Sequence, residues 1–206
     1  VAAIKAGHLA REIVGVSIPQ KKGDAIVVDT DEHPRETSLE ALAKLKGVVR
    51  PDGTVTAGNA SGVNDGACAL LLASESEAAK HGLTPRARVV GMATAGVAPR
   101  VMGIGPVPAV QKLMQQTGLA LSQMDVIELN EAFAAQALAV GKELGWDADR
   151  VNVNGGACAP GHPIGASGAR ILVTLLHALR ARGLKKGMAT LCIGGGEATA
   201  MAVELI

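Results

Sequence analysis

The stretch NVNGGACAPGHPIGASGAR, from Asn152 to Arg170, organises the interpretation of this chain. It contains five glycines and a single histidine, His162, with Cys158 four residues earlier. Glycines at this density indicate tight turns or a close approach of the backbone to another group. A histidine held on such a turn suits acid–base or oxyanion chemistry. It equally suits a packing turn around a buried, hydrogen-bonded histidine, and the stretch alone leaves both interpretations open.

A helix is predicted directly after this turn. Ser167 stands where the helix should begin, and apolar residues then recur on one face over Ala169 to Arg182. Gly183 follows the last of them, as glycine does at many helix ends. The histidine is therefore expected just before the N-terminus of a buried helix.

Composition excludes several classes of protein. The chain has 206 residues, a formal net charge of +1 and only two aromatic residues, Phe133 and Trp146. These values argue against a nucleic-acid or membrane partner, and the longest apolar run, Ala67 to Ala73, is too short to span a bilayer. Three widely spaced cysteines indicate reduced thiols and a cytoplasmic location. Because the chain opens on Val1 within a helix-like pattern, we expect it to be a piece of something longer.

The first 85 residues give a mixed pattern. Two short strands are predicted at 14–18 and 25–28, and the spacing of Thr37 and Glu40 predicts a capping box that opens a helix. The nearly all-apolar run from Gly62 to Ala73 is interpreted as a buried helix. Pro85 marks a plausible boundary.

Beyond Pro85 strands and helices alternate. Strands are predicted at 87–95, 126–129, 188–193 and 198–205, with helices from about 106 and from 130 to 144. The last two strands are joined by too few residues for a parallel crossover, so the sheet must be mixed.

Three motifs in this part carry functional groups. They are NEAF (130–133), GHP (161–163) and CIGGG (192–196), and each lies where a strand or helix meets a loop. Together an amide, an imidazole and a thiol beside a glycine-lined turn can move protons and hold an oxyanion. Taken singly, Asn130 could be a helix cap and Cys192 a buried core thiol.

In their order and spacing these motifs, with VTAGNASG, NDGA and NVNGGA, resemble the thiolase family over the whole chain. The resemblance implies an α/β fold, the C-terminal half of a five-layer αβαβα arrangement, with a mixed five-stranded sheet and helices on both faces. It divides the chain into the end of a loop domain (1–62), a segment closing the N-terminal half (63–83) and a C-terminal domain (84–206).

The family's functional residues carry over by position. His162 matches the histidine that activates a nucleophilic cysteine, and with a water held by Asn130 it forms one oxyanion hole. Cys192 matches the acid/base cysteine, and the N–H of Gly194 matches a second oxyanion hole. The wall for the pantetheine of coenzyme A and the acyl pocket are implied at Ala57, Ala60, Ser61, Met102 and Phe133.

Three departures from the family pattern stand out. Neither Cys68 nor Cys158 occupies the place of the nucleophilic cysteine, which belongs to the family's N-terminal half. Pro160 lacks an N–H two residues before His162, which puts the placement of the imidazole in question. Glu197 stands where thiolases commonly carry an uncharged residue, and its carboxylate either raises the pKa of the Cys192 thiol or points to solvent.

The resemblance implies a coenzyme A-dependent acyltransferase that cleaves or forms 3-oxoacyl-CoA. Coenzyme A is then a substrate, no cofactor is covalently bound, no metal is used, and the full-length protein is a homodimer or homotetramer. Two stretches, 17–46 and 92–110, resemble 3-oxoadipyl-CoA thiolases of aromatic-acid breakdown, for which His33, Arg35 and Arg100 could supply a cation.

Three alternatives remain open. The end of the chain resembles acetoacetyl-CoA thiolases equally well. A non-catalytic, acyl-CoA-binding or oligomerising partner is a second alternative. A ketosynthase is the third, but that class has a second histidine where this chain has Cys192.

Overall fold

A four-stranded mixed sheet forms the centre of the computed structural model, which describes residues 1–206. Its strand order is β3-β6-β5-β4, with β4 and β5 parallel and the other pairs antiparallel. A separate antiparallel hairpin, β1-β2, lies near the N-terminus. The strands are β1 Val16–Ile18, β2 Ile26–Val28, β3 Ala87–Gly96, β4 Val126–Leu129, β5 Lys186–Cys192 and β6 Glu197–Leu205.

The sheet is mixed, as predicted, but it has four strands rather than five. At the outer edge of β4, Val151 makes one parallel bridge with Ile127, and the N–H of Asn152 donates to the Ile127 carbonyl at 2.8 Å. Asn152 then turns the chain with φ of 49°, so the pairing stops after one residue. A fifth strand is reduced to a single bridge here.

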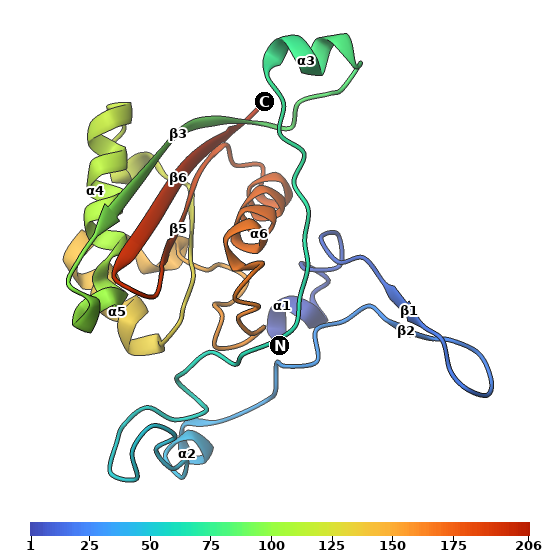
Figure 1. Ribbon diagram of the computed structural model, residues 1–206, viewed down its shortest axis with the longest axis vertical. Helices are drawn as coiled ribbons and strands as arrows, with labels where there is room; N and C mark the ends of the chain where they lie inside the picture. The colour runs from blue at the N-terminus through green and yellow to red at the C-terminus, as the bar shows by residue number, and fades with distance from the viewer.

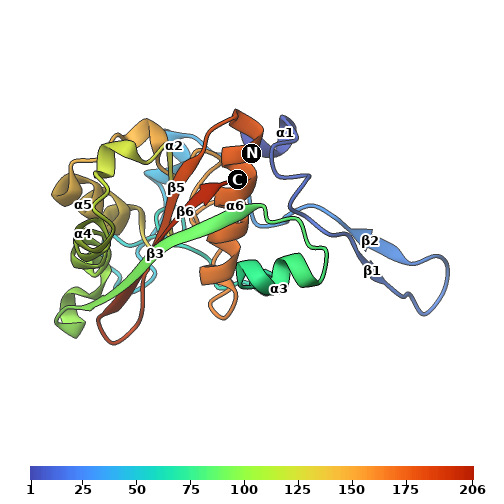
Figure 2. The same cartoon turned by 90° about the horizontal axis from the view of Figure 1, so that it is seen from above.

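Helices cover both faces of the sheet. In Figure 1, α4 and α5 lie on one side of it and α6 on the other, and Figure 2 shows the same layers from above. The α-helices are α1 Ala2–Lys5, α2 Leu39–Leu42, α3 Glu75–Lys80, α4 Pro106–Thr117, α5 Ala134–Leu144 and α6 Ser167–Arg182. Three short 3-10 helices are η1 Pro99–Ile104, η2 Leu121–Gln123 and η3 Ala148–Arg150. None of the helices is long and apolar enough to cross a membrane.

The core consists of two clusters, one on each face. On the first face α4 packs through Ala109, Val110 and Leu113, and on the second α6 packs through Ile171, Leu175 and Leu179. All four residues of β4 are buried, because helices cover both of its sides. This double cover fixes the positions of the strand ends, from which the candidate site is built.

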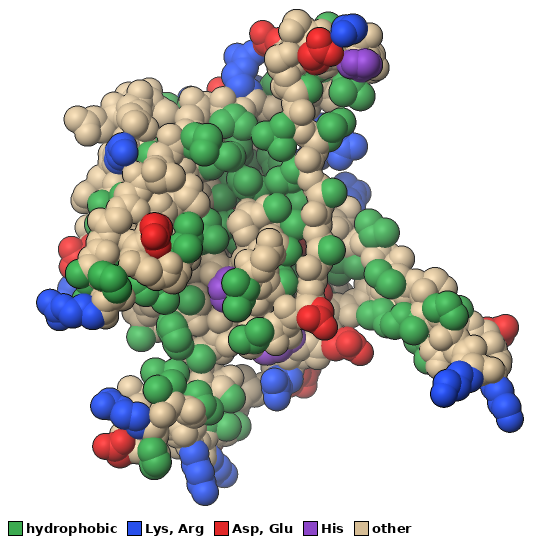
Figure 3. Space-filling view, viewed as in Figure 1, with side chains coloured by type: hydrophobic (Ala, Val, Ile, Leu, Met, Phe, Trp, Pro, Cys, Tyr) green, Lys and Arg blue, Asp and Glu red, His purple; other side chains and the backbone are tan.

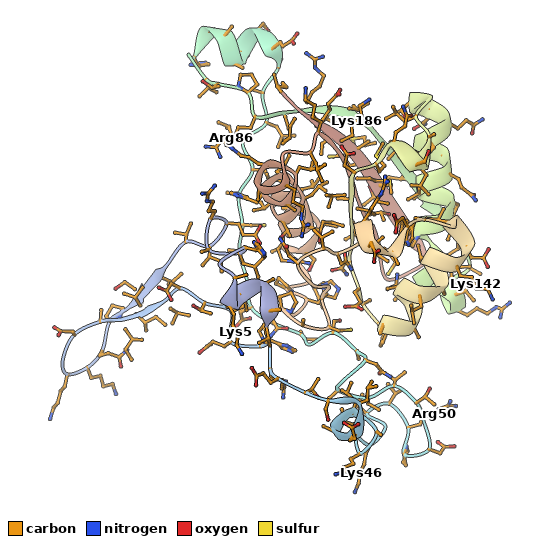
Figure 4. The ribbon with its side chains drawn as sticks, turned by 180° about the vertical axis from the view of Figure 1, so that it is seen from behind. Lys5, Lys46, Arg50, Arg86, Lys142 and Lys186 are labelled. Carbon is orange, nitrogen blue, oxygen red and sulfur yellow. The ribbon has the colours of Figure 1, made fainter.

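The segments before β3 hold few buried residues. They extend away from the sheet as the β1-β2 hairpin and the α2 region (Figure 1), and Figure 3 shows apolar side chains along the hairpin and facing the sheet unit. Figure 4 shows the labelled cations Lys5, Lys46, Arg50, Arg86, Lys142 and Lys186 spread over separate elements rather than gathered on one face.

Three predictions for these segments and for α5 were wrong. The run from Gly62 to Ala73 is not helical; it is an irregular segment with exposed Leu71 and Leu72. The cap of α2 is Ser38, whose Oγ accepts from the N–H of Ala41, and not Thr37. The helix after NEAF begins at Ala134 rather than at Asn130.

Candidate functional site

Two of the predicted groups lie at one edge of the sheet, where the parallel strands β4 and β5 both end. Asn130 directly follows β4, and Cys192 is the last residue of β5. The register pairs Leu129 with Thr190, and the N–H of Asn130 donates to the Thr190 carbonyl at 3.0 Å. The amide and the thiol are therefore brought to the same edge by strand pairing alone.

His162 is held near this edge by hydrogen bonds to a segment about 100 residues earlier in the chain. Its N–H lies 3.0 Å from the carbonyl of Gly62 and 3.2 Å from Oδ1 of Asn64. Gly161 has φ of 101°, and a Cβ there would lie 2.2 Å from the same Asn64 oxygen. Only glycine fits this turn, which explains why the histidine needs a glycine before it.

The hydrogen-bond partners of the imidazole decide its tautomer. The Ser167 hydroxyl donates to the Pro163 carbonyl at 2.9 Å, so its oxygen accepts from Nδ1 of His162 at 2.6 Å. Nδ1 therefore carries the hydrogen, and Nε2 keeps its lone pair. Nε2 lies 3.4 Å from Nδ2 of Asn130, a hydrogen-bond donor. The arrangement aims a proton-accepting nitrogen at the side chain of Asn130.

Electrostatics keep the imidazole neutral. Burial lowers the pKa of His162 below its ordinary value, and the positive charge of Arg170 lowers it further. A neutral imidazole with an unprotonated Nε2 can act as a general base near pH 7. Oδ1 of Asn130 is buried without a partner.

Cys192 has the properties of a proton donor rather than a resting thiolate. The residue is buried, and burial raises the pKa of its thiol above the ordinary value, while the hydrogen bond of its own backbone N–H lowers it. A thiol of this kind stays protonated until a strong base forms beside it.

The turn after Cys192 exposes two backbone donors, the N–H groups of Gly194 and Gly195. The N–H of Gly194 makes no hydrogen bond in the chain, and the residue is exposed. Gly196 has φ of 109° and passes so close to Val97 that a Cβ would lie 2.2 Å from its carbonyl oxygen. Glu197 is exposed, and its carboxylate folds over Gly195. Burial, and not this carboxylate, accounts for the raised pKa of the thiol.

The residues expected to form the wall and the pocket lie beside the NEAF motif. The N–H of Ser61 donates to the Ala132 carbonyl at 3.0 Å, and Ala60 forms an antiparallel bridge with Phe133. Ala57 stands apart from these contacts, in the turn that precedes them.

Met102 reaches the same region from another element. It lies on η1, which packs on α5, since a Cβ on Gly103 would lie 2.8 Å from Cγ of Gln136. Both amide atoms of Gln136 are buried and unpaired.

The two unusual residues of ACAPGHP are accommodated without displacing His162. The turn is closed by N–H groups on either side of Pro160: Ala159 donates to Gly156 and Gly161 donates to Ala157. Cys158 donates its N–H to Oε2 of Glu131 at 3.1 Å. Burial and then the Glu131 charge raise the pKa of the Cys158 thiol to about 12, so it is a poor nucleophile.

The three cations considered for an acidic substrate differ in placement. His33 is half-buried, and its Nδ1 lies 2.9 Å from the Ala159 carbonyl, with the ring packed over Gly62. Arg35 and Arg100 are exposed. His33 therefore ties its loop to the turn of His162 instead of extending into solvent.

The sequence did not identify Ser167, Asn64 or Arg170 as partners of His162. Ser167 lies five residues after the histidine in the same stretch, so a hydroxyl one turn away was a usable signal. Asn64 lies 98 residues away and left no local signal. No group of three or more His, Cys, Asp or Glu side chains is placed to hold a metal ion. Two hollows of about 330 and 260 Å³, which share Leu121 and Leu144, contain none of the predicted site residues.

Known proteins match this chain over its whole length. The family model described as "Thiolase, C-terminal domain" matches residues 83–205, and that described as "Thiolase, N-terminal domain" matches residues 1–76. The beta-ketoadipyl-CoA thiolase of Pseudomonas putida is 64% identical over 208 residues, covering 100% of this chain and 52% of the relative. The acetyl-CoA acetyltransferase of Thiocystis violacea is 57% identical over 204 residues, covering 98% and 52%.

Comparison with solved structures points to the same family. The acetyl-CoA acetyltransferase of Bacillus anthracis superposes with a TM-score of 0.95 at 50% identity, covering 100% of this chain and 52% of that chain. Human mitochondrial 3-ketoacyl-CoA thiolase in complex with CoA gives 0.93 at 47% identity, covering 100% and 51%. The chain spans about half the length of the relatives it matches. By sequence and by fold, the chain belongs to the thiolase family.

Proposed function

We propose that the protein containing this chain is a coenzyme A-dependent thiolase that acts on 3-oxoadipyl-CoA. The observation that carries the proposal is the pair formed by Nε2 of His162 and the Asn130 amide, at the sheet edge where β5 ends in Cys192. This edge combines a neutral base, a protonated thiol and an unpaired backbone N–H, which together suit carbon–carbon cleavage next to a thioester.

In the cleavage direction, Nε2 of His162 accepts the proton of a nucleophilic thiol, and the thiolate attacks the 3-oxo carbon. The family resemblance assigns this thiol to a region that the chain does not span. The C2–C3 bond breaks, and the electron pair leaves as the enolate of acetyl-CoA. Cys192 donates its proton to the enolate carbon, while the N–H of Gly194 stabilises the negative oxygen. Coenzyme A then takes the acyl group from the enzyme thiol, which gives succinyl-CoA.

The substrate choice rests on similarity. The beta-ketoadipyl-CoA thiolase of Pseudomonas putida is 64% identical to this chain over 208 aligned residues, compared with 57% over 204 aligned residues for the acetyl-CoA acetyltransferase of Thiocystis violacea. An acetoacetyl-CoA thiolase is therefore the second candidate. Coenzyme A is a substrate in both cases, and a CoA complex is known for a structural relative that is 47% identical.

Two further properties belong to the same proposal. The first is the homo-oligomeric state, which the resemblance to the thiolase family implies for the full-length protein. The three free cysteines support a cytoplasmic location.

The test is thiolysis by the protein at its natural length, with 3-oxoadipyl-CoA and acetoacetyl-CoA as competing substrates. The proposal expects a higher kcat/KM for 3-oxoadipyl-CoA. Cys192→Ala should lower kcat about a thousandfold, because the enolate then lacks its acid. Cys158→Ala, the matched control, should stay close to the native rate. A Cys192→Ala variant with native kcat would remove the thiol from the mechanism, and a protein that binds acyl-CoA without cleaving it would be a non-catalytic relative.

A further inference from the structure

Glu131, the second residue of the NEAF motif, binds the turn that carries His162. Its Oε2 accepts a hydrogen bond of 3.1 Å from the backbone N–H of Cys158. This N–H donates to no backbone carbonyl, and Glu131 forms no ion pair within the chain. A hydrogen bond to a carboxylate is roughly twice as strong as one between neutral groups. The carboxylate is therefore well suited to hold the turn in place.

The carboxylate also lies over Gly156, near the start of the same turn. A Cβ built on Gly156 would lie 2.4 Å from Oε2 of Glu131 and 2.8 Å from Nδ2 of Asn152. Gly156 is not one of the glycines with positive φ, so its backbone conformation is open to alanine. The space that the Glu131 carboxylate occupies, and not the backbone, therefore requires glycine at this position.

Hydrogen bonds inside the turn connect this contact with the imidazole. Ala159 donates its N–H to the Gly156 carbonyl at 2.8 Å, and Gly161 donates its N–H to the Ala157 carbonyl at 3.0 Å. Cys158 lies between these two bonds, and Gly161 directly precedes the histidine. A displacement of the Cys158 N–H would therefore move the backbone from which the imidazole extends.

The other end of the contact is fixed to the sheet. Asn130, directly before Glu131, is 0% exposed, and its N–H donates to the Thr190 carbonyl at 3.0 Å. The Asn130 amide lies 3.4 Å from Nε2 of His162. Two consecutive residues thus act on the same imidazole: Asn130 faces its ring, and Glu131 holds the turn that carries it.

We propose that Glu131 is a positioning residue for the proposed thiolase reaction: its carboxylate fixes the turn of His162 against the NEAF motif and sets the spacing between Nε2 and the Asn130 amide. The inference rests on the proposed function, because this spacing affects catalysis only if Nε2 accepts the proton of a thiol. A misplacement of about 1 Å can lower a rate by about a hundredfold. The positioning role therefore predicts a defect in kcat rather than in substrate binding.

A carboxylate with only a structural role would behave differently. Its loss would lower the free energy of unfolding, while the molecules that remain folded would keep the native kcat. A positioning carboxylate affects kcat in folded molecules, and the effect follows the hydrogen-bond acceptor. Glu131→Gln keeps an oxygen acceptor on a side chain of the same shape, whereas Glu131→Ala removes it.

The first measurement is thiolysis of 3-oxoadipyl-CoA and acetoacetyl-CoA by the protein at its natural length. Glu131→Ala should lower kcat at least about tenfold, with KM unchanged within about twofold. Glu131→Gln should recover kcat to within about threefold of the native value. Glu143→Ala, exposed on α5, is the control and should keep the native constants. A native kcat in Glu131→Ala, or a Glu131→Gln variant as slow as Glu131→Ala, overturns the inference.

Gly156→Ala tests the same contact without removing the carboxylate. The added methyl group should displace the carboxylate from the Cys158 N–H and lower kcat in the same way as Glu131→Ala. In the double variant Glu131→Ala/Gly156→Ala the methyl group meets no carboxylate, so the two losses should not multiply. Losses that multiply would mean that the two residues act independently, which overturns the inference.

Folding is controlled by the same glycine variant, since Glu131→Ala leaves the Cys158 N–H without an acceptor and can fail to fold. In Gly156→Ala, faster hydrogen exchange of the Cys158 N–H reports that the carboxylate has been displaced. A fall in kcat should accompany it. Faster exchange together with a native kcat overturns the inference.

Spectroscopy separates this inference from the proposed function. The ¹⁵N resonance of Nε2 in histidine-labelled protein reports the position of His162 without turnover, and it is assigned by its loss in His162→Asn. This resonance should shift in Glu131→Ala and stay close to native in Glu131→Gln. If the native protein cleaves neither substrate but the resonance shifts, the proposed function fails while the role of Glu131 in placing His162 stands. An unchanged resonance in folded Glu131→Ala overturns the inference.

Discussion

The α/β unit formed by residues 87–205 buries most of its apolar side chains at least in part. The segments formed by residues 1–83 contain similar apolar residues but leave most of them exposed. All but two of the 35 buried residues lie in the α/β unit or the short connections within it; the exceptions are Leu9 and Ala78. Leucines of the same size are 0% exposed at Leu175 and 70% exposed at Leu72. The second part folds around its own core, whereas the first part is held mainly by contacts with the second.

Those contacts are few and specific. They include the hydrogen bond of His33 to the Ala159 carbonyl, that of Ser61 to Ala132, and that of Thr174 to Glu12. Each one reaches the turn or the helix that positions His162 or the NEAF motif. The contrast teaches that the N-terminal segments contribute to the site more than to the core.

The largest effect should come from matched truncations in the two parts. Leu175→Ala should lower the free energy of unfolding by about 3 kcal/mol, because it leaves a cavity in the α6 core cluster. Leu72→Ala should change it by less than about 0.5 kcal/mol, since the side chain is largely exposed. Urea denaturation of the two variants measures both values. An equal cost at Leu72 would mean that the segment is covered in solution, and the contrast would be lost.

A second prediction concerns the buried carboxyl group of Glu128, on β4. The folded pKa of Glu128, about 8, lies above the ordinary value of 4.5, so the native state binds a proton that the unfolded state releases. This contribution is complete below pH 4.5 and is lost as the pH rises toward 8. Glu128→Gln should therefore match the native stability near pH 5 and exceed it near pH 8.5, by on the order of 2 kcal/mol.

Urea unfolding at both pH values measures this difference, with the exposed Glu143→Gln on α5 as the control. A Glu128→Gln variant that is less stable than the native protein at pH 8.5 would mean that the carboxylate is ionised and required there.

The smallest effect is expected at the contact between the His33 loop and the turn of His162. His33→Ala removes one hydrogen bond and should cost about 1 kcal/mol of stability. It should also loosen the loop, which faster hydrogen exchange of the His162 N–H, the donor to the Gly62 carbonyl, would detect. His8→Ala, on the exposed end of the first helical segment, should change neither quantity. Unchanged exchange in His33→Ala would show that the loop adds nothing to the turn.

Local patterns predicted the α/β unit well because its elements are bounded by strong signals. β4 matches its predicted range at both ends, and Gly183 ends α6 with φ of 66°. The prediction for the run from Gly62 to Ala73 failed for the opposite reason: a nearly all-apolar stretch has no periodicity that separates a helix from an extended segment. Its conformation depends on partners that the run itself does not encode.

The sequence predicted the residues whose own side chains have a chemical role. It did not predict the residues that act by holding those side chains in place. Motifs pointed to Asn130, His162 and Cys192, which the structure places at or beside one sheet edge. Their catalytic roles stay predictions. Asn64 was missed, because its hydrogen bond with His162 joins residues that lie 98 positions apart in the chain.

The hydrogen bond from His162 to Gly62 also bears on how such a protein could be recombined. Consider a chimaera of two parent proteins joined at the sequence boundary, near residue 84. Its imidazole would come from one parent, and the segment at 59–63 that holds this imidazole would come from the other. The foreign segment would then have to reproduce the bridges to Phe133 and His162 on its own. Chimaeras with a junction before Asn59 keep these pairings in one parental piece. A junction that separates these pairings would leave the His162 imidazole out of position even if both parental pieces fold.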